Sequence, residues 1–363
     1  MSSKMMDWAD LSDELLSYIH SKLVGEDAHT FGLVCRSWKA VVTASPYHYS
    51  PCLMHYTRRN RLWNFSQFNN CIHMSLSYLE NADIRCSNFG WLLMSRSDNT
   101  LFFYDPFNNR KVELPCKLGN HYTALCFTHP PTSPDCVVVG FSTLDDGNGI
   151  VKICVLKHGK GVWEEKKYHP KTQLLVSRAA PIFHRGLIYL LDLKGNVATF
   201  DIEKHGCKKS ALTVNSKCLK DYPYNKRKIK EHFLFKIRGG GEEEALFGVM
   251  LVNQERIVEM YRFSETEMEW KLEKDIGDKV LHLSHYSSFG DTAHLKCMAN
   301  RIYFPRFYAA GSAVYYSFAT GMYHSHDGYF SSAKCYGVKR LDYATWITPA
   351  PTPESYGGIL TWF

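Results

Sequence analysis

The chain has 363 residues, with 43 Lys and Arg against 36 Asp and Glu and a formal net charge of +7. Hydrophobic residues make up 45% and charged residues 22%, proportions that exclude a disordered chain and permit a sizeable buried core. A charge this mild also argues against nucleic-acid binding, which usually gathers Lys and Arg on one face.

The twelve cysteines are scattered along the chain and form no CxxC pair. Several of them, such as Cys154, lie in apolar runs, where a thiol usually behaves as a small buried hydrophobe. The first ten residues include Asp7 and Asp10 and lack the apolar segment of a signal peptide. No apolar run is long enough to cross a membrane. We therefore expect free thiols, a cytoplasmic or nuclear location or both, and no membrane partner.

Residues 8–46 show the apolar spacing of helices. Ser12 is a candidate cap for a first helix, and Asp13 and Glu14 fall in its first turn, where acids interact favourably with the helix dipole. Gly25 is expected to end this helix. Its apolar stripe consists of Leu15, Leu16, Ile19 and Leu23.

A second helix is predicted to begin at Glu26 and to continue until Pro46 stops it. Its apolar stripe consists of Ala28, Phe31, Val34, Cys35, Trp38, Val41 and Val42. A helical piece of this size is too small to form an independent core. Its apolar surface must therefore be covered by the rest of the chain or by a partner, and periodicity alone does not choose between the two.

From residue 89 onward, short apolar runs alternate with turn residues, a pattern that indicates β-strands. The aromatic content of 14% favours the same structure, because rings fit pleated surfaces. We interpret the runs as five units of roughly 40–50 residues, each with three or four strands, which is typical of propeller blades. The predicted strands are 90–94, 101–104 and 111–115; 136–141, 151–156 and 163–168; 180–183, 187–191 and 197–201; 232–237, 245–252, 257–263 and 270–273; and 281–286, 294–298, 301–304 and 313–319.

A propeller closes when its first and last segments share a blade. The segment 343–347 is the predicted closing strand, and residues 50–85 could form a sixth blade with help from the C-terminal part of the chain. The predicted fold is mainly β, with a small α-helical N-terminal module of three helices and a propeller of about five to seven blades. The predicted domains are the helical module at 8–46, a linker with the first propeller strands at 47–88, the propeller at 89–350 and a C-terminal tail at 351–363.

Motifs of known active sites are missing from the sequence. It contains no GxSxG, no HExxH and no phosphate loop, since three acids follow the glycines at 239–241. His324 and His326 would share a face of a strand. Without cysteine pairs nearby, we interpret this cluster and the one of His282 and His285 as surface or loop histidines rather than zinc ligands. We predict no catalytic residue, no metal and no cofactor.

Other candidate contact residues lie in predicted loops. The basic run 226–230 is interpreted as a solvated loop, with a nuclear-import signal or a phosphate-contacting patch as the alternative. Aromatic loops of a propeller could contact a partner or pack between blades, so none is assigned as a target site. They are Tyr222, Pro223 and Tyr224; Arg306, Phe307 and Tyr308; and Tyr329 and Phe330.

The helical module resembles an F-box. Residues 8–19 (WADLSDELLSYI) are similar to the opening of that motif, and residues 34–39 (VCRSWK) are similar to its closing signature. Ser12 stands where the family usually has Pro, and both residues suit the first turn of a helix.

The body resembles the kelch-like β-propeller, called the DUF295 domain, of plant F-box proteins. Asp105 stands where that family usually has Asn before Pro106. The similar stretches are 90–93 (GWLL), 105–107 (DPF), 114–115 (LP), 297–304 (CMANRIYF) and 344–346 (ATW). Together the two resemblances cover nearly the whole chain.

The resemblance implies a non-catalytic receptor of a Skp–cullin–F-box ubiquitin ligase. The F-box would bind the Skp-type adaptor and through it the cullin, and the propeller would hold an unknown target protein. The residues implied in the F-box core or its contact face are Leu11, Leu15, Leu16, Ile19, Leu23, Val34, Cys35 and Trp38. Each of them could equally serve only to hold the three helices together. Two alternatives stay open: an adaptor-binding protein outside a ligase, and an enzyme with carboxylates or a metal near the propeller axis.

Overall fold

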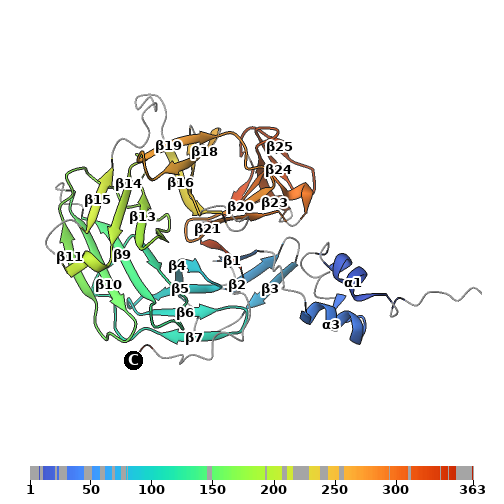
Figure 1. Ribbon diagram of the computed structural model, residues 1–363, viewed down its shortest axis with the longest axis horizontal. Coiled ribbons are helices and arrows are strands. Elements are labelled where there is room, and N and C mark those ends of the chain that lie inside the picture. The colour runs from blue at the N-terminus through green and yellow to red at the C-terminus, as the bar shows by residue number, and fades with distance from the viewer. Residues whose placement is uncertain are drawn as a thin grey trace, which may run out of the picture.

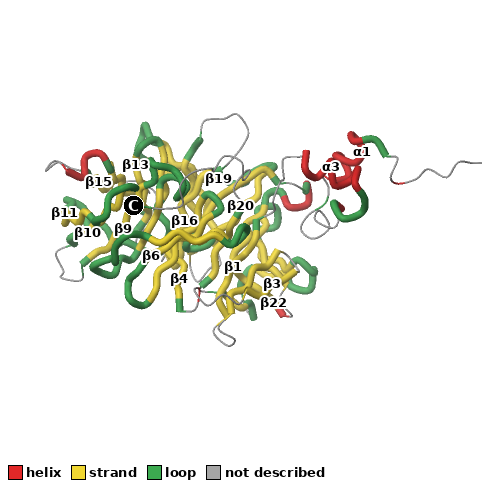
Figure 2. The backbone as a smooth tube through the Cα atoms, turned by 90° about the horizontal axis from the view of Figure 1, so that it is seen from below, coloured by secondary structure: helices red, strands yellow, loops and turns green. Residues whose placement is uncertain are grey.

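The structure is a computed structural model in which a ring of β-sheets is accompanied by a small helical module (Figures 1 and 2). It describes residues 8, 11–20, 23, 31–44, 51–57, 62–67, 70–74, 79, 81–144, 149–192, 194–206, 211–215, 229–237, 244–252, 257–293, 295–309, 312–335, 337–341, 343–348 and 362. Within 42–44, 56–57, 62–67 and 70–74 only the backbone is described.

The helical module contains α1 (Asp13–His20) and α3 (Arg36–Ala44), which Figure 2 shows beside the strands of the ring. Ser12 caps α1 as predicted, because its Oγ accepts a hydrogen bond from the Leu15 amide at 3.4 Å. The single helix predicted from residue 26 to 46 is wrong. A turn at residues 32–34 interrupts it, and α3 begins afresh where the Lys39 amide donates to the Cys35 carbonyl at 3.0 Å. Gly32, a poor helix former, lies at this interruption.

In the part of the chain that the structure describes, the body consists of six sheets, which we call blades 1 to 6. Blade 1 contains β27 (Ala344–Ile347), β1 (Cys52–Thr57), β2 (Leu62–Gln67) and β3 (Asn70–Met74). Blade 2 contains β4 (Ala82–Asn88), β5 (Trp91–Arg96), β6 (Leu101–Asp105) and β7 (Arg110–Glu113). Blade 3 contains β8 (Ala124–Phe127), β9 (Val137–Thr143), β10 (Val151–Lys157) and β11 (Glu164–Tyr168).

The remaining blades follow in chain order. Blade 4 contains β12 (Ile182–His184), β13 (Leu187–Leu191), β14 (Val197–Asp201) and β15 (Leu212–Asn215). Blade 5 contains β16 (Ile229–Lys236), β17 (Leu246–Val252), β18 (Ile257–Ser264) and β19 (Glu269–Glu273). Blade 6 contains β20 (Lys279–Leu283), β21 (Ser288–Thr292), β22 (Arg301–Tyr308), β23 (Ser312–Ser317), β24 (Met322–Ser325), β25 (Ser331–Ser332) and β26 (Lys339–Arg340).

The ring closes in blade 1, where the last strand of the propeller pairs with the first. β27 lies antiparallel to β1, with Leu53 opposite Trp346. The predicted closing strand and the predicted sixth blade are therefore both confirmed. Neighbouring blades meet through their inner strands, because β4 contacts both β27 and β8, and β16 contacts both β13 and β21. The mainly β propeller fold is thus confirmed, with six blades.

Two kinds of element differ from the predicted strands. The predicted strand 294–298 is wrong, since Lys296–Met298 forms a short 3-10 helix in which the Met298 amide donates to the Leu295 carbonyl at 2.8 Å. Several strands were also missed, among them β4 and β8. In β4 apolar and polar residues alternate, and β8 is an apolar run of only four residues. Both patterns predict a strand less clearly than the longer apolar runs of the sequence do.

Buried cysteines contribute to the core as predicted. Cys52, Cys86, Cys126, Cys136 and Cys154 are buried free thiols. Burial raises the pKa of Cys86 to about 12 and that of Cys154 to about 12. These thiols therefore stay protonated and serve as small apolar side chains.

Trp362 anchors the C-terminal part of the chain between blades 2 and 3. Its side chain is 1% exposed, and its Nε1 donates a hydrogen bond to the Pro131 carbonyl at 3.1 Å. Its ring lies 5.6 Å from the ring of Phe103 and 5.0 Å from that of His158. A residue in the predicted C-terminal tail thus belongs to the largest part of the propeller core.

Replacing Trp362 with Ala should lower the free energy of unfolding by about 3–5 kcal/mol, because it empties a fully buried site. Urea unfolding followed by far-UV circular dichroism measures this change. The matched control is Trp8→Ala, since Trp8 is 69% exposed, and it should change the value by less than about 0.5 kcal/mol. Equal unfolding midpoints for the wild type and Trp362→Ala would contradict the anchoring role.

Acid should destabilise the propeller through two buried histidines. Burial lowers the pKa of His232 to about 4 and that of His282 to about 3, so both rings are neutral in the folded chain. In the unfolded chain both histidines bind protons below about pH 6.5, whereas in the folded chain they stay neutral until the pH reaches their lowered pKa. Acid therefore favours the unfolded state, and the free energy of unfolding falls between these two pH values. Below about pH 6.5, His282 should contribute a loss of about 1.4 kcal/mol in the free energy of unfolding for each pH unit, and His282→Phe should abolish this contribution.

The His282→Phe comparison is made by urea unfolding at pH 7.5 and pH 5. Phe keeps the ring that stacks 5.4 Å from Tyr303, so stability at pH 7.5 should be preserved. The control His326→Phe alters an exposed histidine and should keep the acid sensitivity of the wild type. The same fall in stability in all three proteins would show that His282 is not responsible.

Candidate functional site

The helical module has a small core of its own. Leu16, Phe31 and Val41 are at most 4% exposed, and the Phe31 and Trp38 rings pack at a centroid distance of 4.3 Å. The partly buried residues against this core are Leu11, Ile19, Leu23 and Trp38. Five of the eight residues predicted for the F-box core or contact face therefore hold the helices together.

Two of the other three predicted residues lie toward solvent. Leu15 is 52% exposed and Val34 is 56% exposed, whereas Cys35 is half-buried with its Sγ 3.0 Å from Ser37 Oγ. Prediction missed Tyr18 and Leu33, which are 63% and 70% exposed. Tyr18 lies three positions after Leu15 on α1, a spacing that places both on one side of the helix.

Exposed large hydrophobic side chains are concentrated in this module. In the described part of the chain they are Trp8, Leu15, Tyr18, Leu33, Val34, Val162, Ile257, Leu272 and Tyr329, so five of nine lie between residues 8 and 34. Single exposed apolar residues on a large body are ordinary. Several within one small module are typical of a protein interaction surface. We call Leu15, Tyr18, Leu33 and Val34 the apolar face of the module.

The turn between β20 and β21, residues 284–287, contacts several other blades, and we call it the axial turn. Within it the Ser284 Oγ donates to the Ser287 carbonyl at 2.7 Å. The axial turn reaches two other blades through backbone hydrogen bonds: the Ser87 amide of blade 2 donates to the Tyr286 carbonyl, and the Ala180 amide before blade 4 donates to the His285 carbonyl, both at 2.8 Å. The axial turn therefore links blade 6 to two blades that are not its neighbours in the ring.

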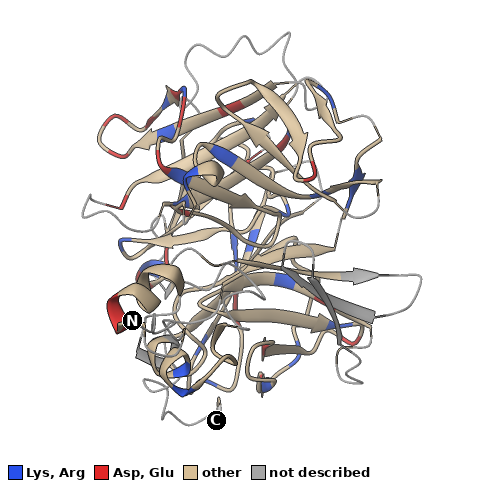
Figure 3. Cartoon of the chain, turned by 90° about the vertical axis from the view of Figure 1, so that its right-hand side faces the viewer, with Lys and Arg blue, Asp and Glu red and all other residues tan. Residues whose placement is uncertain are grey.

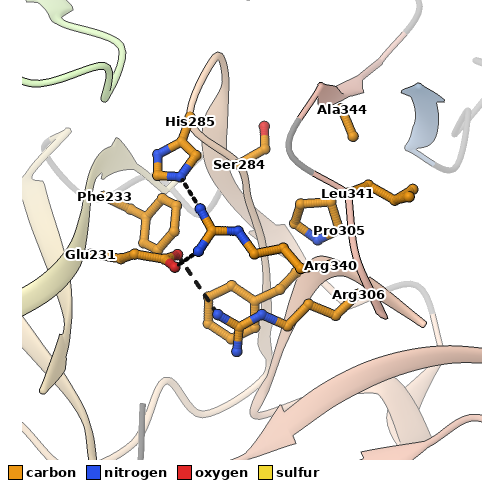
Figure 4. Close-up of a pocket in the computed structure, with 10 residues that line it drawn as sticks. Glu231, Phe233, Ser284, His285, Pro305, Arg306, Arg340, Leu341 and Ala344 are labelled. Carbon is orange, nitrogen blue, oxygen red and sulfur yellow. Dashed lines mark hydrogen bonds and ion pairs between the residues drawn. The ribbon is translucent and has the colours of Figure 1, made fainter. Parts of the chain in front are cut away.

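A buried charge cluster holds the axial turn (Figure 4). Arg340 contacts Glu231 of blade 5 through Nη1 and His285 of the axial turn through Nη2, at 2.8 Å in the second case. Arg306 also faces Glu231, with Nη2 3.7 Å from Oε2. Glu231 is only 6% exposed, so these arginines balance a charge that would be costly to bury alone. The space that the cluster leaves is about 10 Å³, too little for a ligand.

A larger cavity of about 520 Å³ lies beside the axial turn, and residues from all six blades line it. Phe289 and Ser288 come from β21, and Phe89 and Phe127 come from the ends of β4 and β8. Thr348 directly follows the closing strand β27. Prediction missed this cavity, because its walls come from segments that are distant in the sequence.

The histidine clusters do not form a metal site in the described part of the chain, where no group of three or more His, Cys, Asp or Glu could hold an ion. His285 pairs with Arg340, and His324 lies 2.7 Å from Thr320 Oγ1. The interpretation of His282 as a surface or loop histidine is wrong, since it is 2% exposed on β20. It fits there because three aromatic rings, those of Phe289, Tyr303 and Trp346, surround it.

The aromatic loops considered for target binding separate into packing and exposed residues. Arg306 is buried in the charge cluster, and Tyr308 packs 4.8 Å from Phe330. Tyr329, in contrast, is 86% exposed. Tyr222, Pro223, Tyr224 and most of the basic run 226–230 lie outside the described residues. Figure 3 shows Lys and Arg interspersed with Asp and Glu over the elements in view, as the mild net charge suggests.

Comparisons with known proteins match both parts of the chain. The family described as KIB1-4 beta-propeller matches residues 62–328, and the family described as F-box domain matches residues 8–49. The expected plant F-box protein with a β-propeller is thereby confirmed, under the KIB1-4 description rather than DUF295. Among the helices that the structure describes, none has the length and hydropathy needed to span a membrane.

The chain is similar over most of its length to F-box proteins of Arabidopsis thaliana. The F-box/kelch-repeat protein At1g57790 is 29% identical over 333 residues, which cover 88% of this chain and 90% of the relative. The F-box protein At4g00893 is 25% identical over 339 residues, which cover 89% and 83%. The two matched domains together span the helical module and most of the six-bladed ring, and the chain belongs to the KIB1-4 β-propeller family with an F-box domain ahead of its propeller.

Proposed function

We propose that this chain is a substrate receptor of a Skp–cullin–F-box ubiquitin ligase. The apolar face of the F-box module binds the Skp-type adaptor and through it the cullin, and the propeller holds a target protein. The proposal assigns no chemical step to the chain itself. Tethering raises the effective concentration of the target's lysines near a ubiquitin-charged enzyme carried elsewhere in the complex.

The concentration of exposed apolar residues on the F-box module is the observation that carries this proposal. Leu16 is 0% exposed, whereas its neighbour Leu15 is 52% exposed. The module thus has a core that does not need Leu15 or Val34, and these side chains remain available to a partner. A Skp-type adaptor is the partner that the F-box match favours.

Leu15→Asp and Val34→Asp should each weaken binding of the full chain to a Skp-type adaptor. Placing an unpaired carboxylate in an apolar contact costs about 2–3 kcal/mol, or roughly 30- to 150-fold in Kd. Titration calorimetry with purified adaptor measures the change. The matched control is Val162→Asp, because Val162 is 68% exposed on the propeller and its variant should bind as tightly as the wild type.

Leu16→Asp tests the division between core and face. It introduces a charge into the core of the module and should abolish binding by unfolding the helices, whereas Leu15→Asp should keep the wild-type helical signal by circular dichroism. Adaptor binding that is unchanged in both Leu15→Asp and Val34→Asp would refute the proposed contact. Adaptor binding that is absent in the wild type would refute the receptor role altogether.

A further inference from the structure

We propose that the cavity beside the axial turn is a binding site for a neutral, largely apolar small molecule that carries one or two hydrogen-bonding groups. The inference goes beyond the receptor role and does not depend on it, since the cavity lies in the propeller and the adaptor contact lies in the F-box module.

The shape of the cavity is that of a pocket. Its volume of about 520 Å³ falls within the range of about 300–1,000 Å³ that is usual for drug-sized ligands. Ser287 and Ser288 at the end of the axial turn form part of its wall, and the axial turn is tied to blades 2 and 4 by backbone hydrogen bonds. The position of this wall is therefore set by the fold rather than by a loose loop.

Aromatic rings make up much of the wall. Phe89, Phe127, Phe183 and Phe289 come from four different blades and all line the cavity. Phe89 and Phe127 lie 6.0 Å apart with their planes tilted by 58°. Rings of this kind favour a flat apolar ligand, which can stack on one ring and meet the edge of another.

The charged groups of the cavity are already paired. Lys236 Nζ lies 3.0 Å from Glu244 Oε2, and Lys236 lowers the pKa of Glu244, so the pair is ionised and neutral overall. A charged ligand would lose its hydration on entering the cavity, and Lys236 and Glu244 could not offset this cost because each already neutralises the other. The cavity therefore favours a neutral molecule.

Polar groups with remaining hydrogen-bonding capacity specify the rest of the ligand. Asn88 uses its Oδ1 to accept from the Phe89 amide at 3.0 Å, which leaves its amide group as a donor. His129 also lines the cavity, and its Nδ1 lies 3.0 Å from Thr128 Oγ1 and 3.1 Å from the Asp135 carbonyl oxygen. Such groups suit a carbonyl or hydroxyl on the ligand.

Backbone strain at Phe89 supports a ligand site. Its φ of +52° lies in the left-handed region, which is rare for a bulky residue, and Gly90 follows at +80°. An Asn or Gly at position 89 would form this hairpin turn with less strain. The strained residue instead carries one of the rings of the cavity, and strain of this kind collects at binding sites.

Prodan, a neutral flat naphthalene ketone whose emission shifts to the blue in apolar surroundings, is the probe for this site. The full chain should bind one equivalent saturably. Asn88→Asp should weaken binding at least tenfold, because the carboxylate still accepts from the Phe89 amide but repels the ketone oxygen. Ala180→Trp should abolish binding, because the indole fills the cavity that Ala180 lines.

The matched control is Val162→Trp, which adds the same ring at an exposed position and should leave Prodan binding unchanged. Far-UV circular dichroism and urea unfolding of each variant establish that its propeller is folded, and Asn88→Asp keeps the test decisive if Ala180→Trp does not fold. Absence of saturable binding by the wild type would overturn the proposal. Equal binding by the wild type and Asn88→Asp would also overturn it. Neither result would affect the receptor role, which adaptor titration tests separately.

Discussion

The antiparallel pairing of β27 with β1 is the constraint on which the rest of the structure depends. A single blade leaves both faces of its sheet uncovered, and each blade is covered only when its neighbours are in place. Because Leu53 pairs with Trp346, residues nearly three hundred positions apart share one sheet and the ring has no open end. Closure also brings residues of all six blades together around one cavity.

The axial turn links blade 6 to blades 2 and 4, which are not its neighbours in the ring. Arg340 joins the turn to the buried carboxylate of Glu231, and this contact fixes the turn against blade 5. Removing one partner of such a pair leaves a buried charge and is far more costly than a surface ion pair. The same turn forms a wall of the neighbouring cavity, which ties the shape of the proposed ligand site to the charge cluster.

The sequence predicted the features that depend on local pattern. The apolar strands, the closing strand and the Ser12 cap follow from spacing within a few residues, and all three are present. Such local patterns could not predict which residues of the apolar stripe are buried in the module and which are exposed. Leu15 and Leu16 are equally apolar, and only the packing of Leu16 with Phe31 and Val41 shows which one is exposed. Phe89 and Phe289 of the cavity are brought together by ring closure, and no short pattern marks Trp362 as an anchor.

The helical module has its own small core, and the propeller ring closes through β27 and β1 without it, so the proposed adaptor contact should be confined to the module. Hydrogen–deuterium exchange of the full chain, with and without a Skp-type adaptor, tests this separation most directly. The adaptor should slow amide exchange in α1 and in the turn before α3, while exchange in β16 and β27 should stay unchanged. Protection that is absent from the module, or that falls on the propeller strands instead, would contradict it.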